Sequence, residues 1–422
     1  MTPHTDPPPP RAAHTTVIGL MSGTSCDAVD AAAARITHDG TALRLTPLGM
    51  VSEPYDDELR HALATALPPG RTTLADVCRL DTRIGQAFAR LAVRADRELC
   101  AGRAELVASH GQTVFHWADG GRVHGTLQLG EPAWIAEATG LPVVSGFRTR
   151  DVAAGGQGAP LVGLIDRMLL SGRPGVPAAL NVGGIANATV LTPDGTPAAF
   201  DSGPGNALLD AAARHFTAGR LDHDTDGRLA ARGTVHRPLL DRLLAEPYYV
   251  LPAPKTTGRE LFHSGYLRTA LDAVGPLPAP DVLATLTRLT ARTIADALRP
   301  FGVTEVLASG GGTRNPALMA ALRQELGASV RLRASDALGL PSAAKEAYAF
   351  AVLGWLTLHG LAGNLPRCTG AAGPRVLGSI TPGRRPLLLP DRPAEAPATL
   401  TVERAERAER VEPVEPGPLR PR

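Results

Sequence analysis

The stretch GLMSGTSCDAVDAAAARITHDGT, residues 19–41, decides the fold of this chain. Two apolar segments flank a bend of small and hydroxyl residues, and the second ends at an Asp-Gly-Thr reversal. This pattern predicts a strand, a tight turn and a second strand. A bend made only for chain reversal needs Gly or Asn and no more. The surplus of hydroxyl and backbone N–H groups therefore indicates a ligand rich in acceptor oxygens, and phosphate is the first candidate.

Small and acidic residues of this bend carry the expected chemistry. Gly23, Thr24 and Ser25 can surround phosphate oxygens with donors, and Asp27 or Asp30 can hold a hydrated Mg²⁺. The bend is not a Walker P-loop, because the lysine of that motif is missing. From this stretch alone, an ordinary tight turn followed by a capped segment is an equally good interpretation.

The same pattern returns at AALNVGGIANATVLTPDGTPAAF, residues 178–200. Both stretches give a strand, a small-residue turn, a strand and an Asp-Gly-Thr reversal, at 39–41 and 194–196. Elsewhere short β-rich segments alternate with helical ones such as 281–299, which is typical of an α/β fold. Two similar lobes would bind a polyphosphate between their glycine-rich turns. Two unrelated hairpins are the alternative.

Composition excludes several classes of protein. The chain has 422 residues, of which 44% are hydrophobic, enough for two domain cores. Its 43 basic and 41 acidic residues nearly cancel, and only 4% of residues are aromatic. Neither a nucleic-acid groove nor a basic membrane surface is indicated, so a small-molecule partner is expected.

The cysteines and the termini favour a cytoplasmic protein. The four cysteines lack CxxC or zinc-type spacing, which indicates reduced thiols. No apolar run reaches membrane-spanning length, and the Pro-rich N-terminus lacks the apolar core of a signal sequence. We expect residues 1–14 to be a flexible leader and residues 391–422, rich in Pro, Glu and Arg, to be a disordered tail.

The densest candidate segment is GFRTRDVAAGGQGAPLV, residues 146–162. Arg148 and Asp151 precede a Gly-Gly-Gln-Gly turn at 155–158. Such a turn lets a ligand approach the backbone, while the carboxylate can act as a base and the guanidinium can pair with an anion. A lone loop Asp is more often a cap or turn residue, so that reading stays open at this point.

Later segments add further candidates. FDSGPGNALLD (200–210) and PKTTGRELF (254–262) are rich in small polar residues, and SGGGTRNPALM (309–319) follows an expected strand at 303–308 and opens an expected helix. That last turn can present backbone N–H groups to a nucleotide. DHDTDG at 222–227 imitates an EF-hand, but its twelfth position is Gly233, so calcium is not expected.

Taken in order, these segments resemble the anhydro-N-acetylmuramic acid kinases, a bacterial family in the sugar-kinase, Hsp70 and actin superfamily. The resemblance runs from about Thr16 to Gly383 and departs from the usual pattern at Ala28, where Gly is common, and at Gly146, where Asp is common. It rests on GLMSGTSCDAVD, SHGQTVFH, LQLGEP, FRTRDVAAGGQGAPL, NVGGIAN, DSGPGN, KTTGREL, SGGGTRNP and EAYAFA.

The resemblance implies an α/β, two-lobed actin-like ATPase (ribonuclease H-like) fold, with duplicated mixed-sheet domains and a nucleotide in the interlobe cleft. It implies that residues 15–147 plus about 346–385 form lobe I and that residues 148–345 form lobe II. The nucleotide-binding residues that it implies are Gly23, Thr24, Ser25, Asp27, Asp30, Gly183, Gly184, Asn187, Gly310, Gly311 and Gly312.

The resemblance also implies a reaction. The family opens the 1,6-anhydro ring of its sugar with water and phosphorylates the freed O6 from ATP, giving N-acetylmuramic acid 6-phosphate and ADP in peptidoglycan recycling. Asp151 matches the catalytic carboxylate and would act like the base of an inverting glycosidase. Arg148, Gln157 and Glu346 would bind the sugar, Arg148 through its lactyl carboxylate. Mg²⁺, held by Asp27 through water, and a homodimer complete the expectation.

Two alternatives remain at this stage. A kinase of the same fold that acts on another anhydrosugar, such as levoglucosan, would share the phosphate loops, because those loops do not read the sugar. A non-catalytic nucleotide-binding regulator would keep the cleft without the chemistry. The presence of Asp151 with Arg148 weighs against the regulator.

Overall fold

The computed structural model describes residues 14–23, 26–67, 70–120, 122–253, 255–258 and 261–403. Some sequence-based expectations fall elsewhere. The described residues do not include residues 1–13 of the expected leader or residues 404–422 of the expected tail. They also do not include Thr24 and Ser25 of the first bend.

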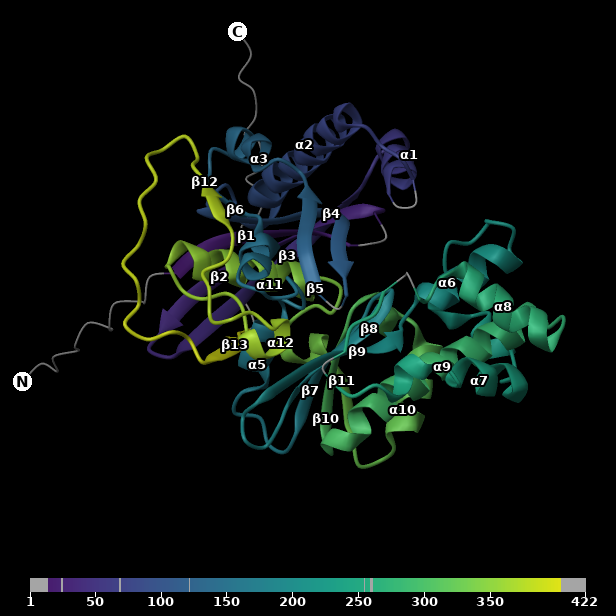
Figure 1. The fold of residues 1–422 in the computed structure, drawn as a ribbon. Helices are drawn as coiled ribbons and strands as arrows, with labels where there is room; N and C mark the ends of the chain where they lie inside the picture. Colours follow the sequence, from purple (N-terminus) through teal and green to yellow (C-terminus); the bar gives the residue numbers. More distant parts are fainter. Residues whose placement is uncertain are drawn as a thin grey trace, which may run out of the picture.

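Two mixed β-sheets form the framework and repeat one strand order (Figure 1). The first contains β1 (His14–Ser22), β2 (Ala28–Asp39), β3 (Ala42–Pro54), β4 (Leu106–Asp119), β5 (Arg122–Leu129), β6 (Val143–Ser145), β12 (Ser379–Thr381) and β13 (Thr399–Val402). The second contains β7 (Pro177–Val182), β8 (Ile185–Leu191), β9 (Pro197–Pro204), β10 (Glu305–Ser309) and β11 (Arg331–Ala334).

The repeat is seen in strand direction as well as in order. The first sheet runs β3-β2-β1-β4-β6, with an antiparallel meander followed by strands parallel to β1. The second runs β9-β8-β7-β10-β11 with the same directions. This is the duplicated mixed-sheet fold expected for an actin-like ATPase, and both predicted hairpin reversals lie where the meanders turn.

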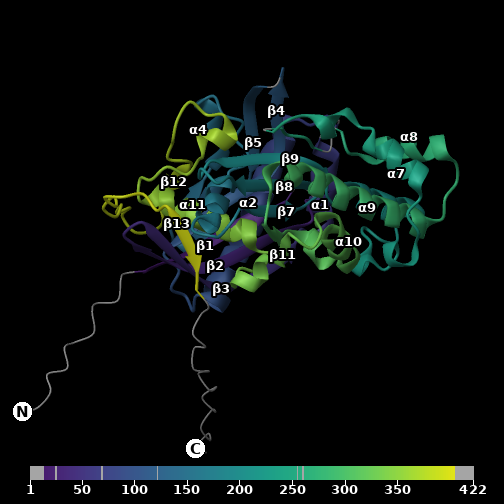
Figure 2. The same cartoon turned by 90° about the horizontal axis from the view of Figure 1, so that it is seen from below.

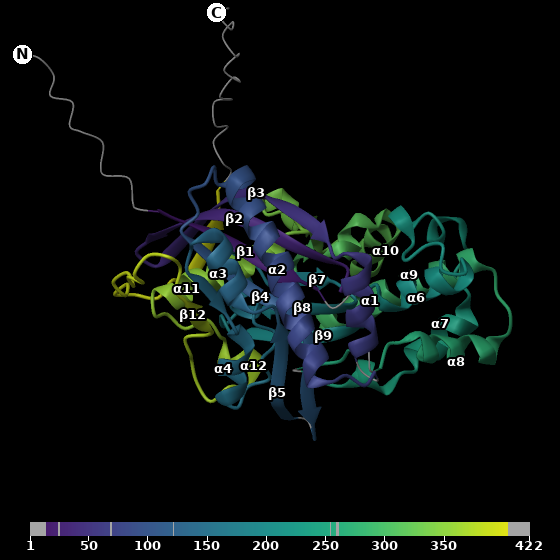
Figure 3. The ribbon, with the colours of Figure 1, turned by 90° about the horizontal axis from the view of Figure 1, so that it is seen from above.

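Helices cover both faces of the first sheet and both faces of the second. They are α1 (Asp57–Ala66), α2 (Leu74–Leu99), α3 (Pro132–Thr139), α4 (Phe147–Ala153), α5 (Gly163–Leu170), α6 (Ala207–Phe216), α7 (Arg237–Leu244), α8 (Ser264–Val274), α9 (Ala279–Leu298), α10 (Pro316–Leu326), α11 (Lys345–Leu358) and α12 (Pro366–Thr369). Helix α2 lies across the first sheet (Figure 3), and α6, α7 and α8 form a helical extension beside α9.

Alternation along the strands explains this layering. In β1, Val17 packs into the core that contains α11, whereas its neighbour Ile18 packs into the core that contains α2. Side chains of a strand point alternately to opposite faces, so a strand that is apolar at successive positions must be covered on both sides. In the second sheet, α9 and α10 cover one face and α5 packs on the other.

The tail is structured further than its composition suggests. Residues 391–422 were expected to be disordered, but residues 399–402 form β13, which pairs in parallel with β3 at the edge of the first sheet (Figure 2). The prediction is wrong for this part of the tail. A four-residue strand gains order from its partner rather than from its own apolar content, which composition does not reveal.

The lobe limits expected from the sequence stay a prediction, although each sheet is built from its own parts of the chain. Within the described residues, no helix is both long enough and apolar enough to cross a bilayer.

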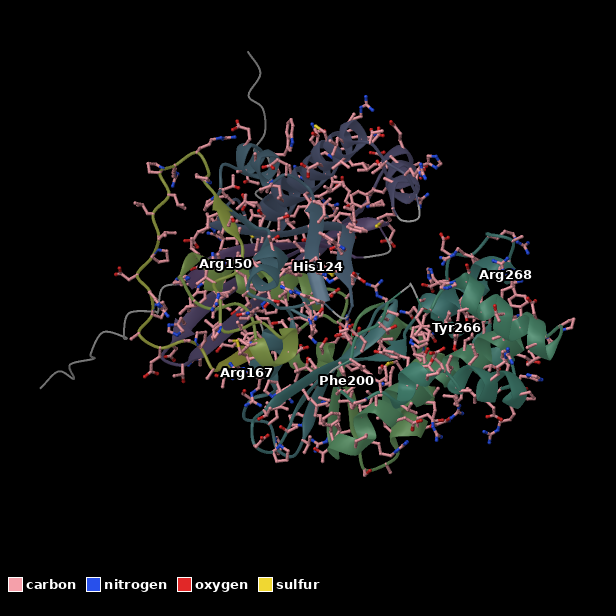
Figure 4. The ribbon with its side chains drawn as sticks, in the orientation of Figure 1. His124, Arg150, Arg167, Phe200, Tyr266 and Arg268 are labelled. Atoms are coloured by element: carbon pink, nitrogen blue, oxygen red, sulfur yellow. The ribbon has the colours of Figure 1, made fainter. Side chains whose placement is uncertain are left out.

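A buried ion pair joins the two halves of the structure. Lys345, one of the two lysines in the chain, begins α11, and its Nζ lies 2.6 Å from Asp166 Oδ1 in α5. The two side chains are 8% and 4% exposed, and Thr189 of β8 donates to the other carboxylate oxygen. Helix α5, which carries Arg167 in Figure 4, lies between the sheets, so this pair connects α11 to the second sheet.

Replacing Lys345 with Met is expected to lower the free energy of unfolding by about 3–5 kcal/mol, because it leaves a buried carboxylate unpaired. Chemical denaturation measures the loss. The Arg60→Met control breaks an exposed pair with Asp57 and should cost no more than about 1 kcal/mol. The double variant Lys345→Met with Asp166→Leu should recover most of the stability. Equal losses for Lys345→Met and Arg60→Met would contradict this assignment.

Candidate active site

A cavity of about 590 Å³ lies between the two sheets. Its walls come from the β4–β5 hairpin, α4 and the turn after it, strands β8 and β9, and α11. Among the predicted site residues, Arg148, Gln157, Asn187 and Glu346 line it. The predicted sugar-binding residues therefore meet in one place, and a ligand there would contact both lobes.

Asp151 is fully buried and does not itself line this cavity, whereas its neighbours Arg148 and Gln157 do. Three donors hold its carboxylate. The Gly158 amide donates to Oδ2 at 2.8 Å, and Asn364 Nδ2 and Thr369 Oγ1 donate to Oδ1 at 2.7 and 2.8 Å. Since a carboxylate offers about four acceptor positions, Oδ2 keeps one for a further donor. Asp151 is thus oriented by its surroundings and is not a helix cap.

The glycines after α4 are required by this geometry. Gly158 has φ 68°, and its amide and carbonyl serve Asp151 and Arg148 respectively. A Cβ atom on Gly156 would lie 2.2 Å from Asp151 Oδ2, which is far inside contact distance. The Gly-Gly-Gln-Gly run therefore allows the backbone to pack closely around the Asp151 carboxylate.

Arg148 is held by neutral partners only. Its Nε donates to His110 Nε2 and its Nη1 donates to the Gly158 carbonyl, both at 2.8 Å. Burial lowers the pKa of Arg148, and the charges of Glu346 and Asp151 oppose this shift. Since a guanidinium stays protonated in proteins, Arg148 presents a positive charge to the cavity.

Glu346, the second residue of α11, lines the same cavity as Arg148 and is partly buried. The pKa of its carboxyl is raised, mainly by burial and also by the charges of Asp166 and Asp30. The charges of Arg148 and Lys345 oppose this rise. A carboxyl with a raised pKa is suited to proton exchange, so Glu346 is the second titratable group of the site.

Gly23 and Cys26 flank the bend that the sequence predicts between β1 and β2. Gly23 O accepts the Cys26 amide, which closes a tight turn between β1 and β2. Gln112 of β4 supports it, because Gln112 Nε2 donates to Gly23 O at 3.1 Å and its Oε1 lies 2.7 Å from Ser22 Oγ. The pairing of β4 with β1 therefore fixes the turn.

Asp27 and Asp30 follow this turn and fit a hydrated cation. Asp27 is exposed and Asp30 half-buried. The pKa of Asp30 is raised, mainly by burial and also by the charge of Asp27. The hydrogen bond with Ser52 and the charge of Arg314 oppose this rise. Two nearby carboxylates open to water suit Mg²⁺, which keeps several waters. Within the described residues no cluster of three or more metal-ligating side chains exists, and Mg²⁺ binding at Asp27 stays a prediction.

The turn at Gly183 and Gly184 and the glycines at 310–312 follow the carboxyl ends of the neighbouring strands β7 and β10. Gly183 and Gly184 accept amides of residues 205–207 at the start of α6. A Cβ on Gly310 would lie 2.4 Å from Asn181 Oδ1, and one on Gly312 would lie 2.4 Å from Val182. These two glycines are explained by packing against β7, whereas Gly311 meets no atom within 4 Å. A role for all three in nucleotide binding stays a prediction.

Several residues of the site were not assigned by sequence reasoning. Asp201, Thr256 and Thr257 line the cavity, and Asp201 accepts the Thr257 amide at 2.9 Å. Their segments, DSGPGN and KTTGREL, were singled out without roles. Asn364 and Thr369 hold Asp151, and neither is predicted from the sequence, because Asn364 lies in a loop and Thr369 ends the short helix α12.

The remaining lysine and the calcium-like segment have structural roles. Lys255 Nζ donates to the carbonyls of Tyr248 and Tyr249 at 3.2 and 2.9 Å, which fixes the segment carrying Thr256. Asp224 of the DHDTDG segment accepts the amides of Leu229 and Ala230, so it closes a local turn.

Replacing Glu346 with Gln is expected to stabilise the ligand-free protein at pH 8. The folded-state pKa of Glu346 is raised from 4.5, so its contribution to stability is present below pH 4.5 and lost as the pH rises through the folded-state pKa. Thermal unfolding from pH 5 to pH 8 should show a gain that grows with pH. The Glu98→Gln control should show the opposite sign, because the pKa of Glu98 is lowered. A gain that is independent of pH would contradict the assignment.

Comparison with known proteins identifies the family. A sequence profile of the anhydro-N-acetylmuramic acid kinases matches residues 15–383. The anhydro-N-acetylmuramic acid kinase of Streptomyces avermitilis is 70% identical over 387 residues, covering 92% of this chain and 100% of that one. That of Rhodococcus erythropolis is 58% identical, covering 92% and 99%. A glucokinase of the ROK family from Streptomyces griseus, solved with glucose and AMPPNP, has 12% identity, covers 81% of this chain and 99% of that chain, and gives a TM-score of 0.34. On the sequence matches, the chain belongs to the anhydro-N-acetylmuramic acid kinase family.

Proposed function

We propose that this chain opens 1,6-anhydro-N-acetylmuramic acid with water and phosphorylates O6 from ATP, giving N-acetylmuramic acid 6-phosphate and ADP in peptidoglycan recycling. Membership of a sugar-kinase family implies a sugar and ATP as substrates. The observation that carries the finer proposal is the 70% identity to a protein of that name over its full length. The cytoplasmic location and the homodimer expected above belong to the same proposal.

Asp151 is the base in this proposal. In this mechanism a water attacks the anomeric carbon and gives its proton to Oδ2 of Asp151. Because Asp151 is fully buried behind the cavity wall that includes Arg148 and Gln157, the mechanism requires this wall to open a path for that water. The bond from that carbon to O6 breaks, and O6 takes the γ-phosphoryl group of ATP while ADP leaves. The buried donors around Asp151 keep the carboxylate in one orientation, which supports this role.

The phosphate side of the cleft would bind ATP. Gly23 and Gly183 follow the carboxyl ends of β1 and β7, where phosphate is commonly bound in α/β sheets, and backbone N–H groups of these turns would bind the phosphates. Asp27 and Asp30 would hold Mg²⁺, which neutralises charge on the phosphate oxygens when bound.

The cavity side would bind the sugar. Arg148 presents its guanidinium to the cavity, and a lactyl carboxylate is the group of this sugar that it can pair with. Gln157 from the turn after α4 and Glu346 from α11 would supply polar contacts to the sugar. Asn187 of β8, expected from the sequence to bind the nucleotide, lines the same cavity, so it lies where the nucleotide and the sugar would meet. Levoglucosan lacks a carboxylate and would leave Arg148 without an anion.

An assay with purified protein, ATP and either sugar tests the proposal. We expect ADP release with 1,6-anhydro-N-acetylmuramic acid and little with levoglucosan. Product analysis should find an opened ring that carries phosphate on O6. Preferred turnover of levoglucosan would favour the related kinase, and ATP binding without turnover on any anhydrosugar would favour the regulator.

Replacing Asp151 with Asn is expected to lower kcat by at least about a hundredfold, because general-base catalysis contributes about 10²–10⁴. The dissociation constant for ATP should change little. The Asp224→Asn control replaces a buried carboxylate that accepts two backbone amides away from the cavity. It should disturb buried hydrogen bonds to a similar extent without affecting the proposed base. Turnover retained in Asp151→Asn would refute the assignment of the base.

A further inference from the structure

His110 of β4 is a buried histidine that contacts the sugar side of the site without lining the cavity. It is 3% exposed, its Nδ1 lies 2.8 Å from the Gly111 carbonyl oxygen, and its Nε2 lies 2.8 Å from Arg148 Nε. Its ring packs on that of Phe350, with centroids 4.6 Å apart, and Phe350 lines the cavity.

The contacts of His110 fix its protonation. Arg148 Nε can only donate, so His110 Nε2 must accept with its lone pair, and Nδ1 must carry the proton that it donates to Gly111 O. Burial and the charge of Arg148 both lower the pKa of His110 well below its usual range, which agrees with a neutral ring.

The hydrogen-bond partners of Arg148 are neutral, although the carboxylates of Glu346 and Asp151 are near enough to stabilise its charge. Two other partly buried arginines pair directly with carboxylates, Arg173 with Glu305 and Arg288 with Glu325. Within the described residues, Arg148 forms no such ion pair. Its Nε and one Nη1 proton are used, so the two protons of Nη2 and the second proton of Nη1 have no acceptor there.

We propose that His110 is a positioning residue that orients Arg148 toward a carboxylate of the bound sugar. The imidazole and the Gly158 carbonyl take one proton each from Nε and Nη1 and so fix the plane of the guanidinium, and the two protons of Nη2 remain for hydrogen bonds to the anion. Selection of carboxylate-bearing anhydrosugars therefore depends on His110 as well as on Arg148. This inference rests on the proposed function, because it assumes that the sugar lies in the cavity beside Arg148.

Two substitutions separate the acceptor from the bulk of the side chain. His110→Phe keeps a ring against Phe350 and removes the acceptor, whereas His110→Gln provides an amide oxygen that can accept from Arg148 Nε. Ser109→Ala is the control, since Ser109 is buried on the same strand and does not contact Arg148. Thermal unfolding of each variant reports on folding.

Dissociation constants measured without ATP test the inference in the absence of turnover. The ligands are 1,6-anhydro-N-acetylmuramic acid and its lactyl carboxamide, which has the same shape without the charge. We expect His110→Phe to weaken binding of the acid about tenfold or more and to change binding of the amide much less. His110→Gln should recover most of the loss, Ser109→Ala should bind as the wild type, and the KM for ATP should stay unchanged.

The outcomes distinguish the inference from the function on which it rests. Equal weakening of acid and amide in His110→Phe, or no recovery in His110→Gln, overturns the positioning role while turnover by the wild type leaves the proposed function intact. Failure of the wild type to bind or phosphorylate the acid overturns both.

Discussion

The site depends on the hydrogen bonds that converge on the Asp151 carboxylate. They come from the Gly158 amide seven residues later and from Asn364 and Thr369 more than two hundred residues later. A fully buried carboxylate is tolerated only when such donors replace water. These donors come from separate segments, so the carboxylate fixes α4, the glycine turn and the C-terminal segment relative to one another. This arrangement places Arg148 and Gln157 in the cavity wall.

The duplicated sheet explains where the ligands belong. In each sheet the first strand of the meander is paired in parallel with the fourth strand, so two turns leave the same edge side by side. In the first sheet these are the Gly23 turn and the segment carrying Gln112, which supports it. In the second they are the Gly183 turn and the glycines at 310–312. A polyphosphate between lobes would meet backbone donors from both.

Sequence reasoning worked where the signal is local. The reversals at 39–41 and 194–196 and the helix at 281–299 follow from turn chemistry and periodicity, and the structure has them. It was wrong for β13, whose order depends on pairing with β3, about 350 residues away. It gave no role to Asn364, because a polar residue in a loop carries no sign of the partner that folding brings to it. The resemblance named Asp151, but not the burial that sets its orientation.

The charges of the ligand-free cleft are arranged in advance of its ligands. Arg148 is partly buried and forms its hydrogen bonds with neutral partners, and burial raises the pKa of Glu346 and of Asp30. An anion would stabilise Arg148 and a cation would stabilise Asp30, whereas an anion at Arg148 would weaken the favourable interaction between Arg148 and Glu346. Under the proposed function, an acidic sugar and a cation-bound triphosphate would be these partners. Binding of the acidic sugar would therefore favour the protonated form of Glu346.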